Sequence, residues 1–193
     1  MKRKMLITGF DPFGGEAVNP AWQAVKRLPD IIGDFELCKL EIPTVFGLAA
    51  EKVLEKAEDF CPNVILSVGM AGTRAAVTPE RIAVNIRDAR IPDNAGNQPV
   101  GAFVVPEGPA AYFATVPVDA MSQAIRDAGL PGMVSNSAGA FVCNDVMYTL
   151  LHRYAGTSVK VGFIHVPRIP EQGEPSLALD HTVAALSAAI LAC

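Results

Sequence analysis

Short runs of apolar residues alternate along the chain with longer segments of helical periodicity. The apolar runs have the length of strands buried on both faces of a sheet; they are residues 3–9, Phe35–Ile42, Val64–Val68, Ile82–Ile86, an extended run from Met133 towards Cys143, and Val159–Pro167. The helical segments are bounded by capping signals such as Asn19-Pro20 and Gly129; they are about residues 20–28, Leu48–Asp59, Asp119–Ala128, Cys143–Tyr154 and a C-terminal helix from near Ser176. This alternation predicts an α/β fold with a mostly parallel twisted sheet that helices cover on both faces.

Length and composition favour one globular domain over residues 1–193. A chain of 193 residues is long enough for a single full hydrophobic core, and its 50% hydrophobic and 19% charged residues exclude disorder. The stretch Arg90–Pro109 is rich in Pro, Gly and Asn and lacks helical periodicity. We expect loops and a short hairpin there.

Charge and cysteine usage narrow the class of protein. The net charge is −4 and the only basic cluster is Lys2-Arg3-Lys4, so nucleic acid is not an expected partner. No apolar run is long enough for a signal peptide core or a bilayer span, which predicts no membrane association. The four cysteines are widely spaced and form no metal-binding pattern. We therefore expect neither disulfides nor a metal, and a cytoplasmic location.

Several chemically distinctive segments are expected at one edge of the sheet. In parallel α/β sheets, reactive groups gather outside the carboxyl ends of the strands. The loop Phe10–Gly15, the loop Gly69–Gly72, Cys143 and His165 all fall at that edge. Their convergence predicts a functional site there.

Cys143 is the candidate nucleophile. It stands at a predicted helix start, where unpaired N–H groups and the positive end of the helix dipole are expected to lower its pKa below the usual value of about 8.5. The preceding Ala138-Gly139-Ala140 leaves room for a substrate to approach. The alternative is a buried free cysteine that acts as a small apolar group.

His165 and Glu80 are the candidate partners of this thiol. His165 ends a buried strand and is the expected base, although a histidine there can also be hydrogen-bonded packing. Glu80 precedes an apolar strand and is a candidate for the acid that orients His165. Its alternatives are an ion pair with Arg81 or plain solvent exposure. Because no G-x-S-x-G elbow is present, the chemistry is assigned to cysteine.

The glycine-rich loop Gly9–Gly15 is interpreted as part of a small-molecule pocket. It matches no phosphate-binding motif, and its two phenylalanines, Phe10 and Phe13, suit an apolar slot to which Phe141 would contribute. A loop that buries its own phenylalanines is the alternative. Asn19 serves either the substrate or the start of a helix, and its position before Pro20 favours the helix cap.

Five separated motifs resemble the pyroglutamyl peptidase I family of cytosolic cysteine peptidases. They are Thr8–Gly15 with Asn19-Pro20, Glu80–Asn85, Asp88–Gly96, Ser137-Ala138-Gly139 with Phe141–Asn144, and Gly162–Pro167. The resemblance runs nearly end to end. It implies a three-layer α/β/α sandwich, no cofactor, a homotetramer, and a triad of Cys143, His165 and Glu80.

The resemblance also implies the reaction, which is removal of N-terminal pyroglutamate from peptides through a thioester. The Cys143 backbone N–H, at the predicted helix start, is a candidate donor to the oxyanion, and the resemblance implies Arg90 as another. The residues expected to contact substrate are Phe10, Phe13, Asn19, Met70, Arg90, Phe141 and Val142. Met70 and Ala140 depart from the family pattern, which often has glutamine and threonine there.

Two other classes of function compete with this hypothesis. A nucleoside-phosphorylase-like transferase also suits loops at the carboxyl edge of a sheet, but it needs a phosphate site, and the sequence contains no motif for one. The second is a non-catalytic module that binds a small molecule. Release of a fluorophore from a pyroglutamyl amide, independent of phosphate and lost on alkylation of the thiol, distinguishes the three.

Overall fold

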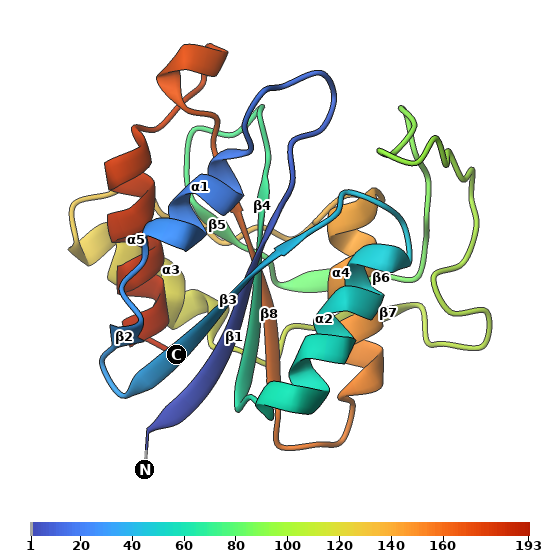
Figure 1. Cartoon of the computed structure of the whole chain (residues 1–193), viewed down its shortest axis with the longest axis horizontal. Coiled ribbons are helices and arrows are strands. Elements are labelled where there is room, and N and C mark those ends of the chain that lie inside the picture. The colour runs from blue at the N-terminus through green and yellow to red at the C-terminus, as the bar shows by residue number, and fades with distance from the viewer. Residues whose placement is uncertain (1) are drawn as a thin grey trace.

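A six-stranded sheet runs through the centre of the computed structural model, which describes residues 2–193 (Figure 1). The strand order is β2-β3-β1-β4-β8-β5. The four inner strands pair in parallel; they are β3 (Phe35–Ile42), β1 (Arg3–Phe10), β4 (Val64–Met70) and β8 (Lys160–Val166). Two short antiparallel strands, β2 (Ile31–Ile32) and β5 (Thr78–Pro79), form the edges. The predicted mostly parallel sheet is confirmed.

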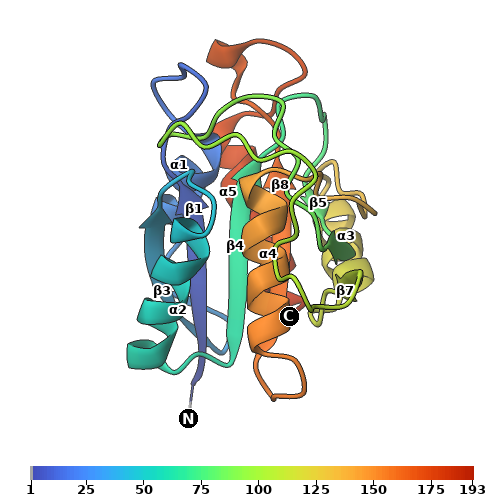
Figure 2. The same cartoon turned by 90° about the vertical axis from the view of Figure 1, so that its right-hand side faces the viewer.

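Helices cover both faces of this sheet, so the predicted α/β/α sandwich is confirmed (Figures 1 and 2). One face carries α1 (Pro20–Arg27), α3 (Val118–Asp127) and α5 (Leu179–Leu191), and the other carries α2 (Leu48–Phe60) and α4 (Val142–Arg153). The alternation of side chains along a strand explains the two cores. Met5 and Ile7 of β1 pack with the first set of helices, whereas Leu6 and Phe10 pack with the second.

The extended run before Cys143 was predicted as a strand, and this prediction is wrong. The segment makes only isolated bridges beside β5, Val77 with Gly132 and Glu80 with Ser135. Pro79 and Pro131 lack the N–H groups that a continuous ladder needs. The chain therefore approaches α4 as an extended segment attached to the sheet at a few points.

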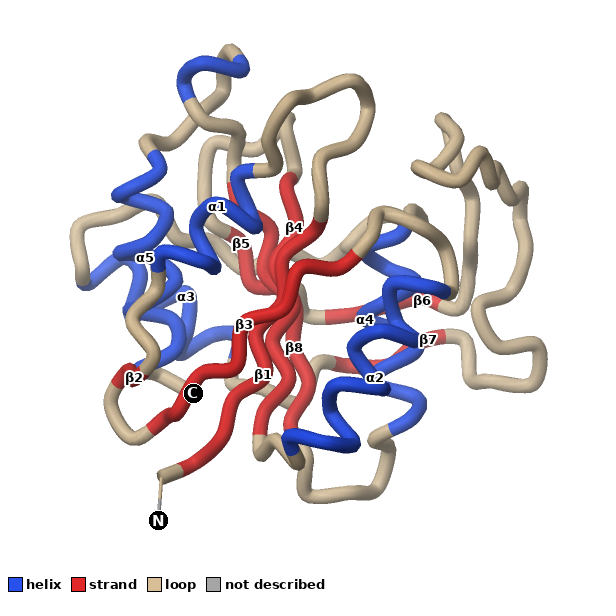
Figure 3. Tube along the Cα trace, in the orientation of Figure 1, coloured by secondary structure: helices blue, strands red, loops and turns tan. Residues whose placement is uncertain are grey.

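The predicted strand Ile82–Ile86 also differs from the structure. It is shorter, β6 (Ile82–Val84), and pairs with β7 (Ala111–Phe113) in a separate two-stranded sheet. Between β6 and β7 the chain runs mostly as loop (Figure 3), with one antiparallel bridge from Arg87 to Ala102. The loops predicted for Arg90–Pro109 are confirmed, whereas the short hairpin is not, because the single bridge joins Ala102 to Arg87, which precedes that stretch.

The carboxyl ends of the inner strands and the start of α4 lie at the same end of the molecule (Figure 1). The C-terminal helix begins at Leu179, after a short 3₁₀ turn at Pro170–Gln172, slightly later than predicted. Within residues 2–193, no helix has both the length and the apolar character needed to cross a membrane.

Gly9 marks the place where α1 packs closest to the sheet, and it provides a test of that packing. A Cβ at Gly9 would lie 2.7 Å from Cα and 2.9 Å from N of Trp22. Because these are backbone atoms, no side-chain rotation relieves the clash. We expect Gly9→Ala to lower the free energy of unfolding by about 1–3 kcal/mol, measured by urea denaturation. The exposed Glu36→Ala on β3 should change it by less than about 0.5 kcal/mol. Equal values for both variants would contradict this role for Gly9.

Candidate active site

Three elements bring the three predicted catalytic residues to the carboxyl edge of the sheet. Cys143 is in the first turn of α4, His165 is near the end of β8, and Glu80 directly follows β5. Glu80 Oε1 and His165 Nδ1 are 2.7 Å apart, and both side chains are buried. The alternatives considered for Glu80 do not describe its surroundings, because it is fully buried and Arg81 pairs with Asp119 at 2.8 Å.

Gly69 of β4 lies next to the Cys143 thiol and pairs with His165 of β8. It pairs with His165 in the register of β4 and β8, so the two residues face the same side of the sheet. A Cβ at Gly69 would lie 2.8 Å from Cys143 Sγ and 2.9 Å from Cζ of Phe163. The thiol therefore occupies part of the space that a side chain at position 69 would fill, on the face of the sheet that His165 also faces. The thiol and the imidazole share no hydrogen bond in this structure, and hydrogen bonds of this kind are often long or poorly aligned in active sites without substrate.

The expected direction of the Cys143 pKa shift is wrong. Burial, together with the negative charge of Glu80, raises the pKa of the thiol to about 12. The positive charge of Arg74 and the Cys143 backbone N–H lower the pKa but do not offset the cost of placing a charged thiolate in this environment. The partly exposed Cys143 thiol is thus neutral near neutral pH, and it could act as a nucleophile only with a base to remove its proton.

His165 has the protonation state that such a base needs. Burial lowers its pKa below the usual value, Arg74 lowers it further, and the hydrogen bond and charge of Glu80 only partly restore it. For Glu80, burial acts to raise the pKa, but the His165 and Arg74 interactions prevail and the pKa is lowered. The site therefore combines a carboxylate, a neutral imidazole and a neutral thiol near neutral pH.

The start of α4 leaves backbone donors open beside the thiol. Phe141 is the N-cap residue and its side chain makes no capping hydrogen bond. Within residues 2–193, the N–H groups of Val142 and Cys143 have no hydrogen-bond acceptor. Such free donors at a helix N-terminus stabilise negative charge on a neighbouring oxygen.

An aromatic cluster of Phe13, Phe46 and Phe141 lies next to this helix start. The ring of Phe141 is 6.3 Å from that of Phe13 and 5.3 Å from that of Phe46. All three side chains are partly exposed. Phe10 was expected in the same slot, but it is only 2% exposed and its ring packs against Phe163. Phe10 and the fully buried Val142 both belong to the hydrophobic core that packs with α2 and α4.

The other residues expected to contact substrate have different surroundings. Asn19 caps α1 through Ala21 N and donates to the Asp11 carbonyl, which is the structural role favoured for it. Met70 ends β4 and is partly exposed. Arg90 is exposed, in a loop that Asp88 N links to the carbonyl of Ala140, close to the start of α4.

Three aspartates that the sequence analysis did not single out hold the loop carrying Phe46. Three N–H groups of that loop donate to different carboxylates: Thr44 N to Asp11, Phe46 N to Asp93 and Gly47 N to Asp145. Asp145 also binds Arg87 Nε at 2.6 Å. The sequence offered one sign of a role for Asp145, which is its position directly after Cys143-Asn144 in the first turn of α4.

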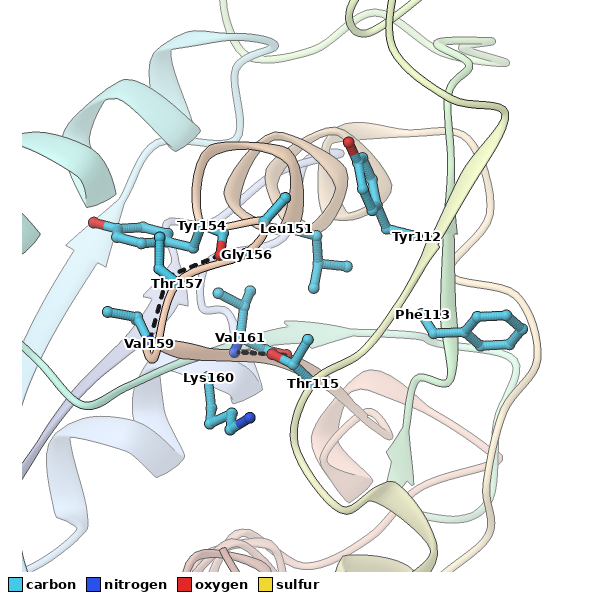
Figure 4. A pocket seen from close by; sticks show the side chains of 11 residues that line it. Tyr112, Phe113, Thr115, Leu151, Tyr154, Gly156, Thr157, Val159, Lys160 and Val161 are labelled. Carbon is cyan, nitrogen blue, oxygen red and sulfur yellow. Dashed lines mark hydrogen bonds between the residues drawn. The ribbon is translucent and has the colours of Figure 1, made fainter.

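A separate hollow of about 240 Å³ lies at the other end of β8, between the end of α4 and β7 (Figure 4). Its wall includes Tyr112, Leu151, Tyr154 and Lys160. None of the three candidate catalytic residues lines it. The three candidate residues lie at the opposite, carboxyl edge of the sheet.

The buried ion pair of Asp145 with Arg87 generates a prediction on stability. Asp145→Ala leaves the Gly47 N–H and the Arg87 guanidinium without their acceptor, and Arg87 is only 26% exposed. We expect the free energy of unfolding to fall by about 2–4 kcal/mol, measured by urea denaturation. Asp119→Ala, which removes a surface pair with Arg81, should cost less than about 1 kcal/mol. A cost for Asp145→Ala as small as that of the control would contradict this assignment.

Comparisons with known proteins agree on one family. The family model described as pyroglutamyl peptidase matches residues 3–193. A pyrrolidone-carboxylate peptidase of Levilactobacillus brevis is 56% identical, over 98% of this chain and 96% of that one. The crystal structure of pyroglutamyl peptidase I from Bacillus amyloliquefaciens superposes with a TM-score of 0.96 at 44% identity, covering 100% of this chain and 95% of that one. Pyrrolidone carboxyl peptidase from Thermococcus litoralis gives a TM-score of 0.93 at 39% identity, over 98% and 92% of the two chains. The chain belongs to the pyroglutamyl peptidase family.

Proposed function

We propose that this protein removes N-terminal pyroglutamate from peptides, with Cys143 as nucleophile, His165 as base and acid, and Glu80 as the group that orients His165. The observation that carries the proposal is the position of Cys143 Sγ over Gly69, on the same sheet face as the His165–Glu80 pair. Membership of the family supplies the substrate class. The open donors of α4 support attack on a carbonyl.

The proposed reaction begins with transfer of the thiol proton to His165. At the same time the sulfur attacks the carbonyl carbon that joins the pyroglutamyl residue to the next amino acid. Glu80 holds the imidazole in the required tautomer and stabilises its cation. The oxyanion accepts hydrogen bonds from the Cys143 N–H and from Arg90, whose loop lies close to the start of α4. His165 then protonates the departing amine, and a water molecule hydrolyses the thioester to release pyroglutamate and the free thiol.

The aromatic cluster suits the unusual chemistry of this substrate. A pyroglutamyl ring is flat and uncharged, and it lacks the terminal ammonium that other aminopeptidases bind. Phe13, Phe46 and Phe141 offer apolar surfaces to such a ring. Free glutamate or glutamine would lose the hydration of its charged groups there, so the slot favours the lactam. Met70, at the end of β4, is the candidate for a further contact.

The two alternative functions make different demands on the site. A phosphorylase-like transferase requires phosphate for turnover, and a binding module gives no turnover at all. Oligomerisation, to a tetramer by the family resemblance, and a cytoplasmic location stay predictions. The four cysteines are all free, which suits a reducing compartment.

The test of the proposal is hydrolysis of a pyroglutamyl amide that releases a fluorescent amine. We expect turnover without added phosphate, and its loss when the thiol is alkylated. Cys143→Ser should reduce kcat by a factor of about 10³ or more, because the serine hydroxyl is a far weaker nucleophile at neutral pH. His165→Ala should be comparably damaging.

Matched variants separate chemistry from folding in this test. Cys61→Ser removes an exposed thiol, and His152→Ala removes a histidine on α4 that hydrogen-bonds Tyr112. Both should retain near-parental kcat. Near-parental activity of Cys143→Ser would overturn the nucleophile, whereas equal losses for His152→Ala and His165→Ala would show that histidine changes act through folding.

The pH dependence of kcat/KM provides an independent check. Because the His165 pKa is lowered, the neutral imidazole that acts as base persists below the usual histidine pKa of about 6.5. Activity should therefore rise with pH along an acid limb centred below about 6.5, and change little from there to neutral pH. An acid limb centred above about 7 would contradict the neutral resting imidazole.

A further inference from the structure

We propose that Arg74 is a positioning residue of this site: it holds the Glu80 oxygen that His165 also uses, and thereby keeps the imidazole neutral in the resting protein. Arg74 follows β4 in a loop and belongs to none of the motifs that pointed to the active site. The inference rests on the proposed use of Cys143 and His165.

Arg74 makes three hydrogen bonds around the catalytic pair. Its Nη1 donates to Glu80 Oε1 and to Thr78 Oγ1, both at 2.5 Å, and its Nη2 donates to the carbonyl of Ser137 at 2.9 Å. Glu80 Oε1 is the same atom that lies 2.7 Å from His165 Nδ1. One carboxylate oxygen thus lies between a permanent cation and the imidazole.

The second oxygen of Glu80 shows why this sharing matters. Glu80 Oε2 is buried and has no hydrogen-bond partner among the described residues. If Arg74 were removed, the carboxylate would lose its charged partner and keep the His165 hydrogen bond, with Ser135 as its remaining polar neighbour, so it could rotate more freely. Arg74 therefore determines which oxygen faces His165 and in which orientation, and Thr78 Oγ1 links the same network to the His165 carbonyl at 3.4 Å.

The charges that face His165 come from separate elements. Glu80 follows β5, Arg74 lies in the loop after β4, and the Cys143 thiol approaches from α4. Burial and Arg74 lower the His165 pKa, while Glu80 raises it. A carboxylate that is already neutralised by a guanidinium stabilises an imidazolium less than a free carboxylate does. Arg74 therefore shifts the resting pair towards a neutral imidazole, which is the form that accepts the thiol proton.

Arg74 also connects the pair to the nucleophile through the backbone. Its bond to the Ser137 carbonyl attaches the extended segment that leads into α4. Arg81 attaches the same segment in another way, with Nε on Asn136 Oδ1 and a bidentate pair on Asp119. Arg81 has no bond to Glu80 among the described residues, so it provides a matched control for the tether without the charge effect.

The experiment compares Arg74→Met, Arg74→Lys and Arg81→Met with the parent protein. The readouts are the His165 pKa by NMR of the imidazole, the pH dependence of Cys143 alkylation by iodoacetamide, and kcat and KM on the pyroglutamyl amide. For Arg74→Met we expect the His165 pKa and the acid limb to rise by about one unit. We expect kcat at pH 6 to fall by about three- to eightfold, the loss of neutral imidazole that a one-unit rise from below about 6.5 produces, with KM changed less than about threefold.

The remaining variants separate the effect of the Arg74 charge on His165 from the effect of its hydrogen bond to the segment before α4. Arg74→Lys keeps the charge but not the fork, so its acid limb should lie between those of the parent and Arg74→Met. Arg81→Met should keep the parental His165 pKa. An unshifted His165 pKa in Arg74→Met, or an equal shift in Arg81→Met, would overturn the proposal. If Arg74→Met does not fold, judged by circular dichroism, Arg74→Gln replaces it as a neutral variant that keeps a donor.

A double variant tests whether Arg74 acts through Glu80. In a Glu80→Gln background, Arg74→Met should shift the His165 pKa by much less than it does alone. A shift of the same size in both backgrounds would overturn the proposed route. The NMR and alkylation measurements need no substrate. Failure of the proposed function would therefore show as absent turnover with the His165 shift intact, which separates it from failure of the Arg74 proposal.

Discussion

The site depends above all on the parallel pairing of β4 with β8, which places Gly69 beside His165. Only a residue without a side chain leaves the space into which Cys143 Sγ descends from α4. A shift of this pairing by one residue would turn His165 to the other face of the sheet. The sheet register thus determines whether thiol and imidazole meet at all, before any question of pKa arises.

Burial gives the site its electrostatic character. It opposes the thiolate and the imidazolium more strongly than the helix N-terminus favours a negative sulfur, so the resting groups are neutral. The carboxylate of Glu80 is the exception, because two partners stabilise its charge. In the reaction proposed for this site, charge would develop next to donors that are already in place at the start of α4.

The sequence predicted the sandwich, the mostly parallel sheet and the edge at which the candidate residues gather, because these follow from local periodicity and general rules of topology. It did not predict the isolated bridges before Cys143, where prolines interrupt an otherwise strand-like run, or the depth at which Phe10 is buried. Arg74 and Asp145 were missed for a common reason. Their importance lies in contacts with residues distant along the chain. Arg74 carries no local sign of such contacts, and the sign for Asp145 is only its place in the first turn of the helix that carries Cys143.

The three aspartates on the Phe46 loop link the aromatic cluster to completion of folding. Asp11, Asp93 and Asp145 come from distant parts of the chain, and they bind neighbouring N–H groups of one short loop. Contacts of such long sequence separation cost more loop-closure entropy than local ones, so this loop reaches its position only when distant parts of the chain are already in place. An incompletely folded chain would have the Cys143 thiol but not the assembled aromatic cluster. Selectivity for substrate would then arise only together with the native state, and a folding intermediate would be a poor peptidase.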